Sequence, residues 1–159
     1  MSTEKPDLTP LCLRARDLIR QGRMPDALGL YDDVLKIDPD FAMAHADKGT
    51  ALAMMKQFDD ALAELEKAFA LGYAEASAYT TAGSIRLEQR QYQQALAHYA
   101  KAIELNPDYP FTYFNRANAY RAIGDKANAL ADLKTCLSFG GAEDFRQLVM
   151  KRIAEVERT

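Results

Sequence analysis

Small and apolar residues recur along this chain at helical spacing, in a pattern that repeats every 34 residues. The dipeptide Ala-Leu marks the period and occurs, without insertions between the copies, at residues 27–28, 61–62, 95–96 and 129–130. In the third period, apolar residues at short helical intervals form two runs, one from Tyr79 to Leu87 and one from Tyr92 to Ile103. This spacing places each run on one face of a helix. Each period therefore predicts a pair of helices.

Four periods fill residues 8–143, with boundaries at 8–41, 42–75, 76–109 and 110–143. The eighth place of each period is small, as shown by Ala15, Gly49, Gly83 and Ala117. A small residue where two helices cross lets their backbones approach, while larger neighbours interlock around it. The second helices are expected to end at Pro39, Gly72, Pro107 and Gly140.

The segments outside the repeats differ in character. In residues 144–159, Phe145, Val149, Ile153 and Val156 share one helical face and charged residues lie opposite. An open stack of helix pairs needs such a helix to cover its last apolar face, so 144–159 is predicted to be a capping helix. The N-terminal end has no comparable cap, and residues 1–7 are predicted to be disordered.

The period, the small residue of each first helix and the alanine of each Ala-Leu pair resemble the tetratricopeptide repeat (TPR) family. The resemblance covers residues 8–143, although Leu11 and His45 replace the usual first-helix aromatic. It implies an all-α fold, a right-handed α-solenoid of antiparallel helix pairs. It also implies that the first helices line a groove, in which extended peptides or short helices of other proteins lie.

Composition narrows the function classes. The net charge of −3 and a pI near 5.4 argue against a nucleic-acid-binding protein, which would carry a basic face. The N-terminal residues lack the apolar run of a signal peptide, and no stretch is long and apolar enough to span a membrane. Cys12 and Cys136 are far apart and form no disulfide framework, which favours a reducing compartment. We expect a cytoplasmic protein.

No pattern of residues predicts catalysis. His45 stands where later repeats have Tyr79 and Tyr113, and this register predicts a helix-packing role; loss of an activity on mutation of His45 would indicate an enzyme instead. Neither it nor the solvent-facing His98 has carboxylate or cysteine neighbours at ligand spacing, so no metal is expected. The sequence also lacks phosphate-binding glycine loops and nucleophile motifs, so we expect no cofactor and no enzymatic activity.

The cysteines differ in their expected environments. Cys136 occupies a place that is small in every repeat, and it is predicted to be an inert packing residue. Cys12 lies on a first helix, at a position that allows its side chain to be exposed to solvent. Only Arg14 and Arg16 are near enough in the sequence to activate its thiol.

The fourth first helix carries a polar stripe. Once Tyr113, Ala117 and Tyr120 are assigned to packing, the face that remains holds Phe111, Phe114, Asn115, Asn118, Arg121 and Ala122. An asparagine amide donates and accepts, so it can pair with a partner's backbone whatever the side chains are. In related repeats asparagines at these places hold peptide backbones, which the resemblance carries over to Asn115 and Asn118. A solvated polar face without a partner is the alternative.

The same register extends the candidate surface to the earlier repeats. The predicted peptide-binding residues are Arg16, Asp47, Thr50, Thr81, Ser84, Phe111, Phe114, Asn115, Asn118 and Arg121. Phe111 and Phe114 are expected to supply apolar anchorage beside the asparagines. With Arg20 and Glu88 included, the charged members of this face have a weak positive balance.

One partner class is excluded on the resemblance. TPR co-chaperones that bind the acidic C-terminal tails of heat-shock chaperones use a carboxylate clamp: a lysine and asparagine pair, a second asparagine, then a lysine and arginine. From the first repeat the matching places read Cys12, Arg16, Asp47, Ser77 and Thr81. From the second they read Ala46, Thr50, Thr81, Phe111 and Asn115. Neither set is the clamp, and Asp47 is expected to repel a carboxylate.

These observations favour a non-enzymatic adaptor whose groove holds a peptide or helix of a partner protein. An alternative is a bacterial secretion-type TPR chaperone, which would bind unfolded apolar segments and dimerise through its N-terminal region. An assembly or scaffold role, with stacks joined end to end through the uncapped first repeat, is a further alternative. We expect a monomer or a weak homodimer.

Overall fold

The computed structural model describes residues 6–158, which form nine α-helices and no strand. Residues 1–5 of the predicted N-terminal tail lie outside the described residues. The chain divides into two compact units, unit 1 (Met1–Ala74) and unit 2 (Glu75–Thr159). The expected all-α fold is confirmed, and each unit is described separately below.

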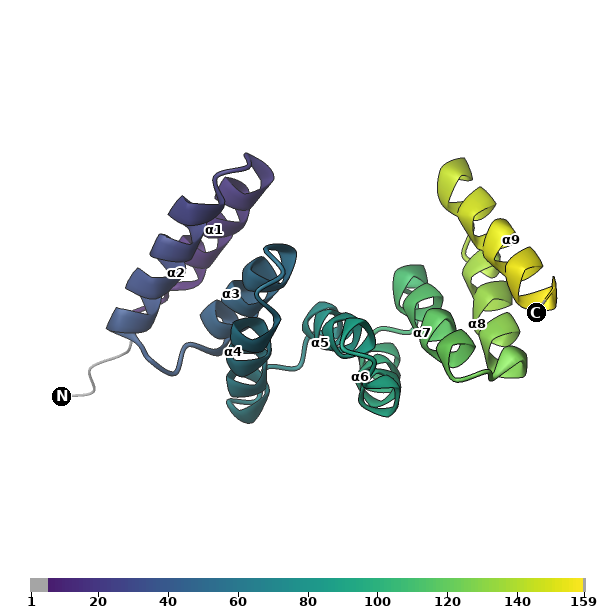
Figure 1. Cartoon of the computed structure of the whole chain (residues 1–159). Coiled ribbons are helices and arrows are strands. Elements are labelled where there is room, and N and C mark those ends of the chain that lie inside the picture. Colours follow the sequence, from purple (N-terminus) through teal and green to yellow (C-terminus); the bar gives the residue numbers. More distant parts are fainter. Residues whose placement is uncertain (1–5, 159) are drawn as a thin grey trace. The chain divides into compact units, whose positions relative to one another are not determined.

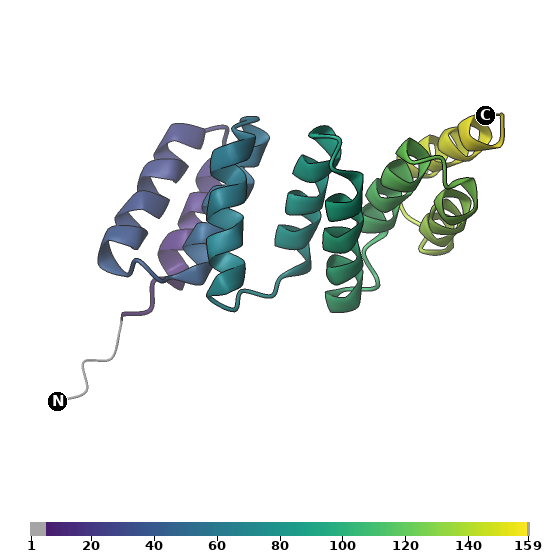
Figure 2. The ribbon, with the colours of Figure 1, turned by 60° about the horizontal axis from the view of Figure 1, so that its bottom comes forward.

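Unit 1 consists of two antiparallel helix pairs (Figures 1 and 2). Its helices are α1 (Thr9–Arg20), α2 (Met24–Ile37), α3 (Ala42–Met54) and α4 (Phe58–Ala70). Helix α3 packs on its own partner α4 and also on α1 and α2 of the preceding pair. Cys12, Ala15, Tyr31 and Val34 are fully buried where α1 meets α2.

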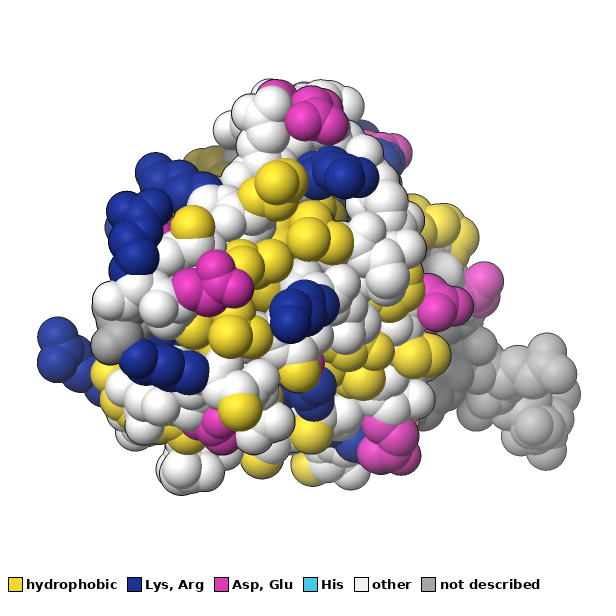
Figure 3. Space-filling model, turned by 90° about the vertical axis from the view of Figure 1, so that its right-hand side faces the viewer, with side chains coloured by type: hydrophobic (Ala, Val, Ile, Leu, Met, Phe, Trp, Pro, Cys, Tyr) yellow, Lys and Arg dark blue, Asp and Glu magenta, His cyan; other side chains and the backbone are white. Residues whose placement is uncertain are grey.

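Unit 2 has two helix pairs and a ninth helix. Its helices are α5 (Ala76–Glu88), α6 (Tyr92–Leu105), α7 (Pro110–Ala122), α8 (Lys126–Ser138) and α9 (Glu143–Arg158). Helix α9 packs on α8, with Val149 and Val156 fully buried and Phe145 and Ile153 partly buried. Viewed from the side on which α9 lies, the surface shows apolar side chains among basic and acidic ones (Figure 3).

Two glycines on first helices lie directly against the second helix of their pair. A Cβ atom on Gly49 of α3 would lie 2.8 Å from Cγ of Leu65 and 2.9 Å from the carbonyl oxygen of Ala61. A Cβ atom on Gly83 of α5 would lie 2.7 Å from Cε1 of Tyr99. Ordinary van der Waals contact begins near 3.4 Å, so a methyl group at either place would overlap the side chain packed against it, and at Gly49 also a backbone oxygen.

The turn within each helix pair repeats one backbone conformation. Gly22, Lys56, Arg90 and Gly124, each 34 residues after the last, all have positive φ. Gly124 has a φ of 80°, which a glycine adopts without steric cost. Asp125 then caps α8, because its carboxylate accepts a hydrogen bond from the backbone N–H of Asn128.

Polar groups connect three helices of unit 1 in a chain. Nζ of Lys48 on α3 lies 2.9 Å from Oδ1 of Asp32 on α2 and 2.8 Å from Oε1 of Glu64 on α4. The other oxygen of Glu64 lies 2.5 Å from Nδ1 of His45, whose Nε2 lies 2.8 Å from the carbonyl oxygen of Pro39. His45 is buried on α3, and both nitrogens of its ring have hydrogen-bond partners.

Unit 2 has a comparable pair between α7 and α8. The guanidinium of Arg116 donates two hydrogen bonds of 2.7 Å to the carboxylate of Asp132. Asp132 is buried, and these bonds raise the pKa of Arg116. Cys136 is also buried on α8, and burial raises the pKa of its thiol to about 12, which suits the predicted inert packing residue.

The close approach at Gly49 predicts a stability difference between two glycine-to-alanine changes in unit 1. Gly49→Ala should destabilise the protein, because an overpacking cost of about 1–3 kcal/mol exceeds the helix-propensity gain of roughly 0.5–1 kcal/mol. Gly29→Ala on α2 is the control, since a Cβ atom there meets nothing within 4 Å. It should stabilise the protein by up to about 1 kcal/mol. Urea unfolding measures both, and equal shifts would contradict the packing account.

The partly buried carboxylate of Glu64 predicts a pH dependence of stability. Burial favours a higher pKa, but hydrogen bonds from Lys48 and His45 outweigh it and hold the pKa of Glu64 below its ordinary 4.5. The contribution of this carboxylate is therefore present above pH 4.5 and lost as pH falls through the folded-state pKa. Urea unfolding from pH 7 to pH 3 should show Glu64→Gln less stable than wild type at neutral pH, with the two converging in acid. Parallel curves would contradict this prediction.

Candidate functional site

The predicted peptide-binding residues of unit 2 lie on two adjacent helices, α5 and α7. Buried hydroxyls join these helices, because Oγ1 of Thr80 lies 2.9 Å from Oγ1 of Thr112. This contact fixes the spacing between the exposed sides of α5 and α7. We call the surface formed by Thr81, Ser84, Asn115, Asn118 and Arg121 the α5–α7 face.

The hydroxyl groups on α5 are already engaged. Thr81 donates to the carbonyl of Ser77 and Ser84 donates to the carbonyl of Thr80, each at 3.0 Å. Ser84 also accepts a hydrogen bond from the hydroxyl of Tyr99 at 3.2 Å. Hydroxyls that bond back onto their own helix have no hydrogen left to donate to a ligand. Thr81 and Ser84 can therefore act toward a peptide only as acceptors.

The polar groups on α7 remain available. Asn115, Asn118 and Arg121 follow one another at intervals of three, which places them along one side of the helix. The side chains of Asn115 and Arg121 have no hydrogen bond or ion pair to another residue in the range 6–158. Oδ1 of Asn118 is buried and has no hydrogen-bond partner among the described residues. An unpaired buried carbonyl costs about 1–3 kcal/mol, so a ligand that donates to it recovers this free energy.

Asn118 and Arg121 border an open cleft of about 430 Å³. The end of α5, the turn into α6 and the last turns of α7 contribute its lining, which consists of Leu87, Glu88, Arg90, Tyr92, Asn118, Arg121 and Ala122. We call it the α5–α7 cleft. Two arginines and one glutamate give it a positive balance. Leu87, Tyr92 and Ala122 add apolar surface beside the amide.

The two phenylalanines of α7 pack toward the ninth helix. The ring of Phe111 lies 4.5 Å from that of Phe145, and the ring of Phe114 lies 5.8 Å from it. The guanidinium of Arg152 on α9 covers Phe114 at 5.8 Å. The expectation that Phe114 stands beside the asparagines as an anchor therefore needs correction, because α9 occupies this ring. Phe111 keeps 47% of its surface exposed.

The predicted site residues of unit 1 are held by one another. The guanidinium of Arg16 donates two hydrogen bonds of 2.8 Å to the carboxylate of Asp47, and these raise the pKa of Arg16. The Asp47 side chain is only 12% exposed. The expectation that Asp47 repels a carboxylate is therefore corrected, because Arg16 balances its charge at close range. Thr50 donates to the carbonyl of Ala46 at 3.0 Å and has, like Thr81, no hydrogen left to donate.

Leu13, and not Cys12, lies on the exposed side of α1. Cys12 is fully buried rather than exposed, and burial raises the pKa of its thiol to about 11. Leu13 is 48% exposed. Counting back by 34 from Asn115 gives Thr81, Asp47 and then Leu13, so the repeat itself contained the signal. The first repeat thus presents an apolar side chain where the fourth presents an amide.

The described residues offer neither a metal-binding cluster nor a membrane-spanning helix. Within residues 6–158, no three His, Cys, Asp or Glu side chains gather as they would around a metal ion. None of the helices in that range combines the length and apolar character that crossing a membrane requires.

Comparisons with known proteins agree on one family. Models of the TPR repeat match residues 18–81, 83–124 and 112–139. Among curated proteins, Hsp70-Hsp90 organizing protein 3 of Arabidopsis thaliana is 24% identical over 131 residues, which are 82% of this chain and 19% of that protein. The chain spans 13–19% of the length of three curated relatives that it matches.

Solved structures share the fold. PilF of Pseudomonas aeruginosa has a TM-score of 0.82 at 21% identity, over 94% of this chain and 68% of that one. YrrB, described as a TPR protein with an unusual peptide-binding site, has a TM-score of 0.74 at 23% identity, over 86% of this chain and 71% of that one. The repeat period, the helix pairs and the family matches together show that this chain belongs to the tetratricopeptide repeat family.

Proposed function

We propose that this chain is a non-enzymatic protein-interaction module that binds an extended peptide segment of a partner on the α5–α7 face. The observation that carries the proposal is the buried, unpaired Oδ1 of Asn118 at the edge of the α5–α7 cleft. A folded protein that keeps such an atom without a donor is less stable than it could be. A backbone N–H of a bound peptide supplies the missing donor.

The neighbouring groups suit the rest of a peptide. Asn115, three residues earlier on α7, can donate to a backbone carbonyl and accept from a backbone N–H. Arg121 and Arg90 favour a peptide with a carboxylate near the cleft, and Glu88 moderates that preference. Leu87 and Tyr92 offer apolar contact for one side chain. The α5–α7 face would therefore bind a peptide mainly through hydrogen bonds to its backbone, and its arginines would add a preference for acidic peptides.

The relatives suggest the kind of partner to expect. TPR proteins mediate protein–protein interactions, and the name of one relative refers to heat-shock chaperones. We do not extend that partner to this chain through a carboxylate clamp, because the places of the clamp lack its lysines. Arg16, the cation at those places in the first repeat, is engaged by Asp47. We place the interaction in the cytoplasm, in keeping with two free, buried thiols.

Peptides selected on the chain itself can test this surface while the partner is unidentified. Peptides selected from a random display library on the full chain should bind Asn118→Ala about fivefold to tenfold more weakly, since one hydrogen bond of about 1 kcal/mol or slightly more is lost. Asn118→Ala should not lower the free energy of unfolding, because it removes an unpaired buried atom. Calorimetric titration and urea unfolding provide the two readouts. Arg121→Ala should weaken acidic peptides more than neutral ones.

Lys134→Ala is the matched control, because Lys134 is exposed on α8 and does not line the cleft. It should leave peptide affinity within twofold of wild type. If the selected peptides bind Asn118→Ala and Arg121→Ala as tightly as wild type, the α5–α7 face is not the binding surface. Selection of unfolded apolar segments regardless of these residues would instead support the secretion-chaperone alternative.

A further inference from the structure

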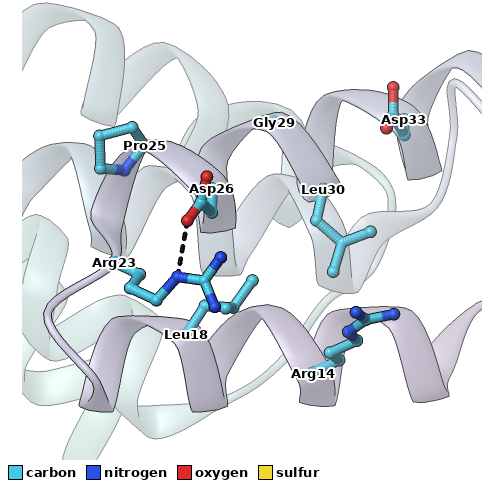
Figure 4. Close-up of a pocket in the computed structure, with 8 residues that line it drawn as sticks. All are labelled: Arg14, Leu18, Arg23, Pro25, Asp26, Gly29, Leu30 and Asp33. Atoms are coloured by element: carbon cyan, nitrogen blue, oxygen red, sulfur yellow. Dashed lines mark hydrogen bonds and ion pairs between the residues drawn. The ribbon is translucent and has the colours of Figure 1, made fainter.

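A second cleft lies in unit 1 between α1 and α2. Its volume is about 410 Å³, and its lining consists of Arg14, Leu18, Arg23, Pro25, Asp26, Gly29, Leu30 and Asp33. Figure 4 shows Leu18 and Arg14 on one helix and Leu30 on the other pointing into the space between them. We call this the first-repeat cleft. It shares no residue with the α5–α7 cleft.

The corresponding surface of the second repeat is covered by a helix of this chain, α2. Lys48 follows Arg14 by 34 residues, and its Nζ lies 2.9 Å from the carboxylate of Asp32 on the preceding helix, α2. Arg14 therefore occupies the position in the first repeat that Lys48 occupies in the second, where the preceding helix supplies a carboxylate. In the part of the chain that the structure describes, no helix precedes α1, and the Arg14 side chain has no hydrogen bond or ion pair with a described residue.

The apolar residues of the cleft follow the same relation. Leu52, the counterpart of Leu18, is only 7% exposed, whereas Leu18 itself remains partly exposed. Leu30 replaces Glu64, which in the second repeat pairs with Lys48. The first repeat has thus lost the internal carboxylate and gained an apolar side chain at the same position. A helix that covers this cleft buries both leucines and must bring its own carboxylate to Arg14.

The residue at position 11 lacks an interaction that its counterparts in two later repeats make with the preceding linker. Its counterparts His45 and Tyr113 hold the carbonyl oxygens of Pro39 and Pro107 at 2.8 and 2.9 Å, in the linkers that lead from the preceding helix. Leu11 cannot form this hydrogen bond. The first repeat therefore keeps the docking place for a preceding helix but lacks the anchor for a covalent linker.

We propose that the first-repeat cleft binds an acidic amphipathic helix of a partner protein, seated as α2 is seated on α3. The helix places an aspartate or glutamate against Arg14, and apolar residues at neighbouring helical positions against Leu18 and Leu30. The other charged residues of the cleft are paired with one another or with neighbours, Arg23 with Asp26 at 2.7 Å and Asp33 with Lys36 at 2.8 Å. Arg14 is thus the cation that selects the partner.

The ninth helix of a second copy fits this place less well. Its apolar residues Val149 and Val156 are buried against α8 within its own chain. Its exposed surface carries Arg146, Lys151 and Arg158 besides its acids, and these would oppose Arg14. The favoured occupant is therefore a different protein.

The test uses this chain's own α2 as the probe, because α2 is the helix that brings Asp32 to Lys48. A fluorescent peptide of residues 24–37, held helical by a hydrocarbon staple, is titrated with the full chain and followed by anisotropy. It should bind, and Arg14→Glu in the chain should weaken binding at least about threefold. Asp32→Lys in the peptide should weaken it similarly. The two reversals together should restore affinity toward the wild-type value, since the charges again attract.

Two matched controls separate this surface from others. Arg20→Glu changes an exposed arginine on the same helix that does not line the cleft, and it should leave peptide affinity unchanged. Asn118→Ala should also leave it unchanged, whereas peptides on the α5–α7 face lose affinity there. Failure of the charge swap to restore binding, or sensitivity to Asn118→Ala, would overturn the proposal. Self-association of the chain that Arg14→Glu abolishes would replace the partner with a second copy.

A tethered form covers the case of a peptide too weak to detect. A copy of residues 24–41 placed directly before Leu8 raises the effective concentration of the helix to the millimolar range. Docking should raise the melting temperature, and the same fusion with lysine at the place of Asp32 should lose that increase. If both fusions melt as the parent chain does, the cleft does not accept a helix.

Discussion

The close approach of two helices within each repeat is the constraint on which the rest of the structure depends. At Gly49 and Gly83 the backbone of the first helix lies so near its partner that a single methyl group would overlap it. Tyr99 and Leu65 can then pack across the backbone, fully buried. This contact commits one side of every first helix to its partner. The opposite side, free of any packing role within its pair, is where binding residues can vary.

That division explains why polar groups on the free side differ in their availability. The hydroxyls of Thr50, Thr81 and Ser84 donate hydrogen bonds to carbonyls of their own helices. Arg16 on α1 and Asp47 on α3 form an ion pair with each other. Asn118 alone among the predicted site residues keeps a buried oxygen unpaired within the described range. An amide oxygen only accepts hydrogen bonds, so the carbonyls of its own helix cannot satisfy it as they satisfy a threonine hydroxyl, and it retains capacity for a ligand that donates.

The period of the sequence was sufficient to predict the helices and the small crossing residues, because each depends on spacing along one or two helices. It was not sufficient for Arg16 with Asp47, since that pair joins two repeats and no other repeat has the same two residue types. Phe114 was misplaced because the interpretation treated α7 as an inner helix, whereas α9 covers that part of it. Leu13 was missed although the register contained it. The register must be counted from the site residue itself, because an offset of one place turns a side chain by about 100°.

One position of the repeat shows how a single interaction can serve both stacking and recognition. Lys48 and Arg116 each pair with an acid on the second helix of their own repeat, and Lys48 also reaches the preceding helix. At Arg14 the internal acid has become Leu30, so the cation is no longer neutralised within its pair. A charge beside partly exposed leucines is stable in water but better satisfied by a carboxylate on an apolar helix. The position that joins α3 to α2 through Lys48 is therefore, at Arg14 in the first repeat, the one we propose to bind a helix of a partner.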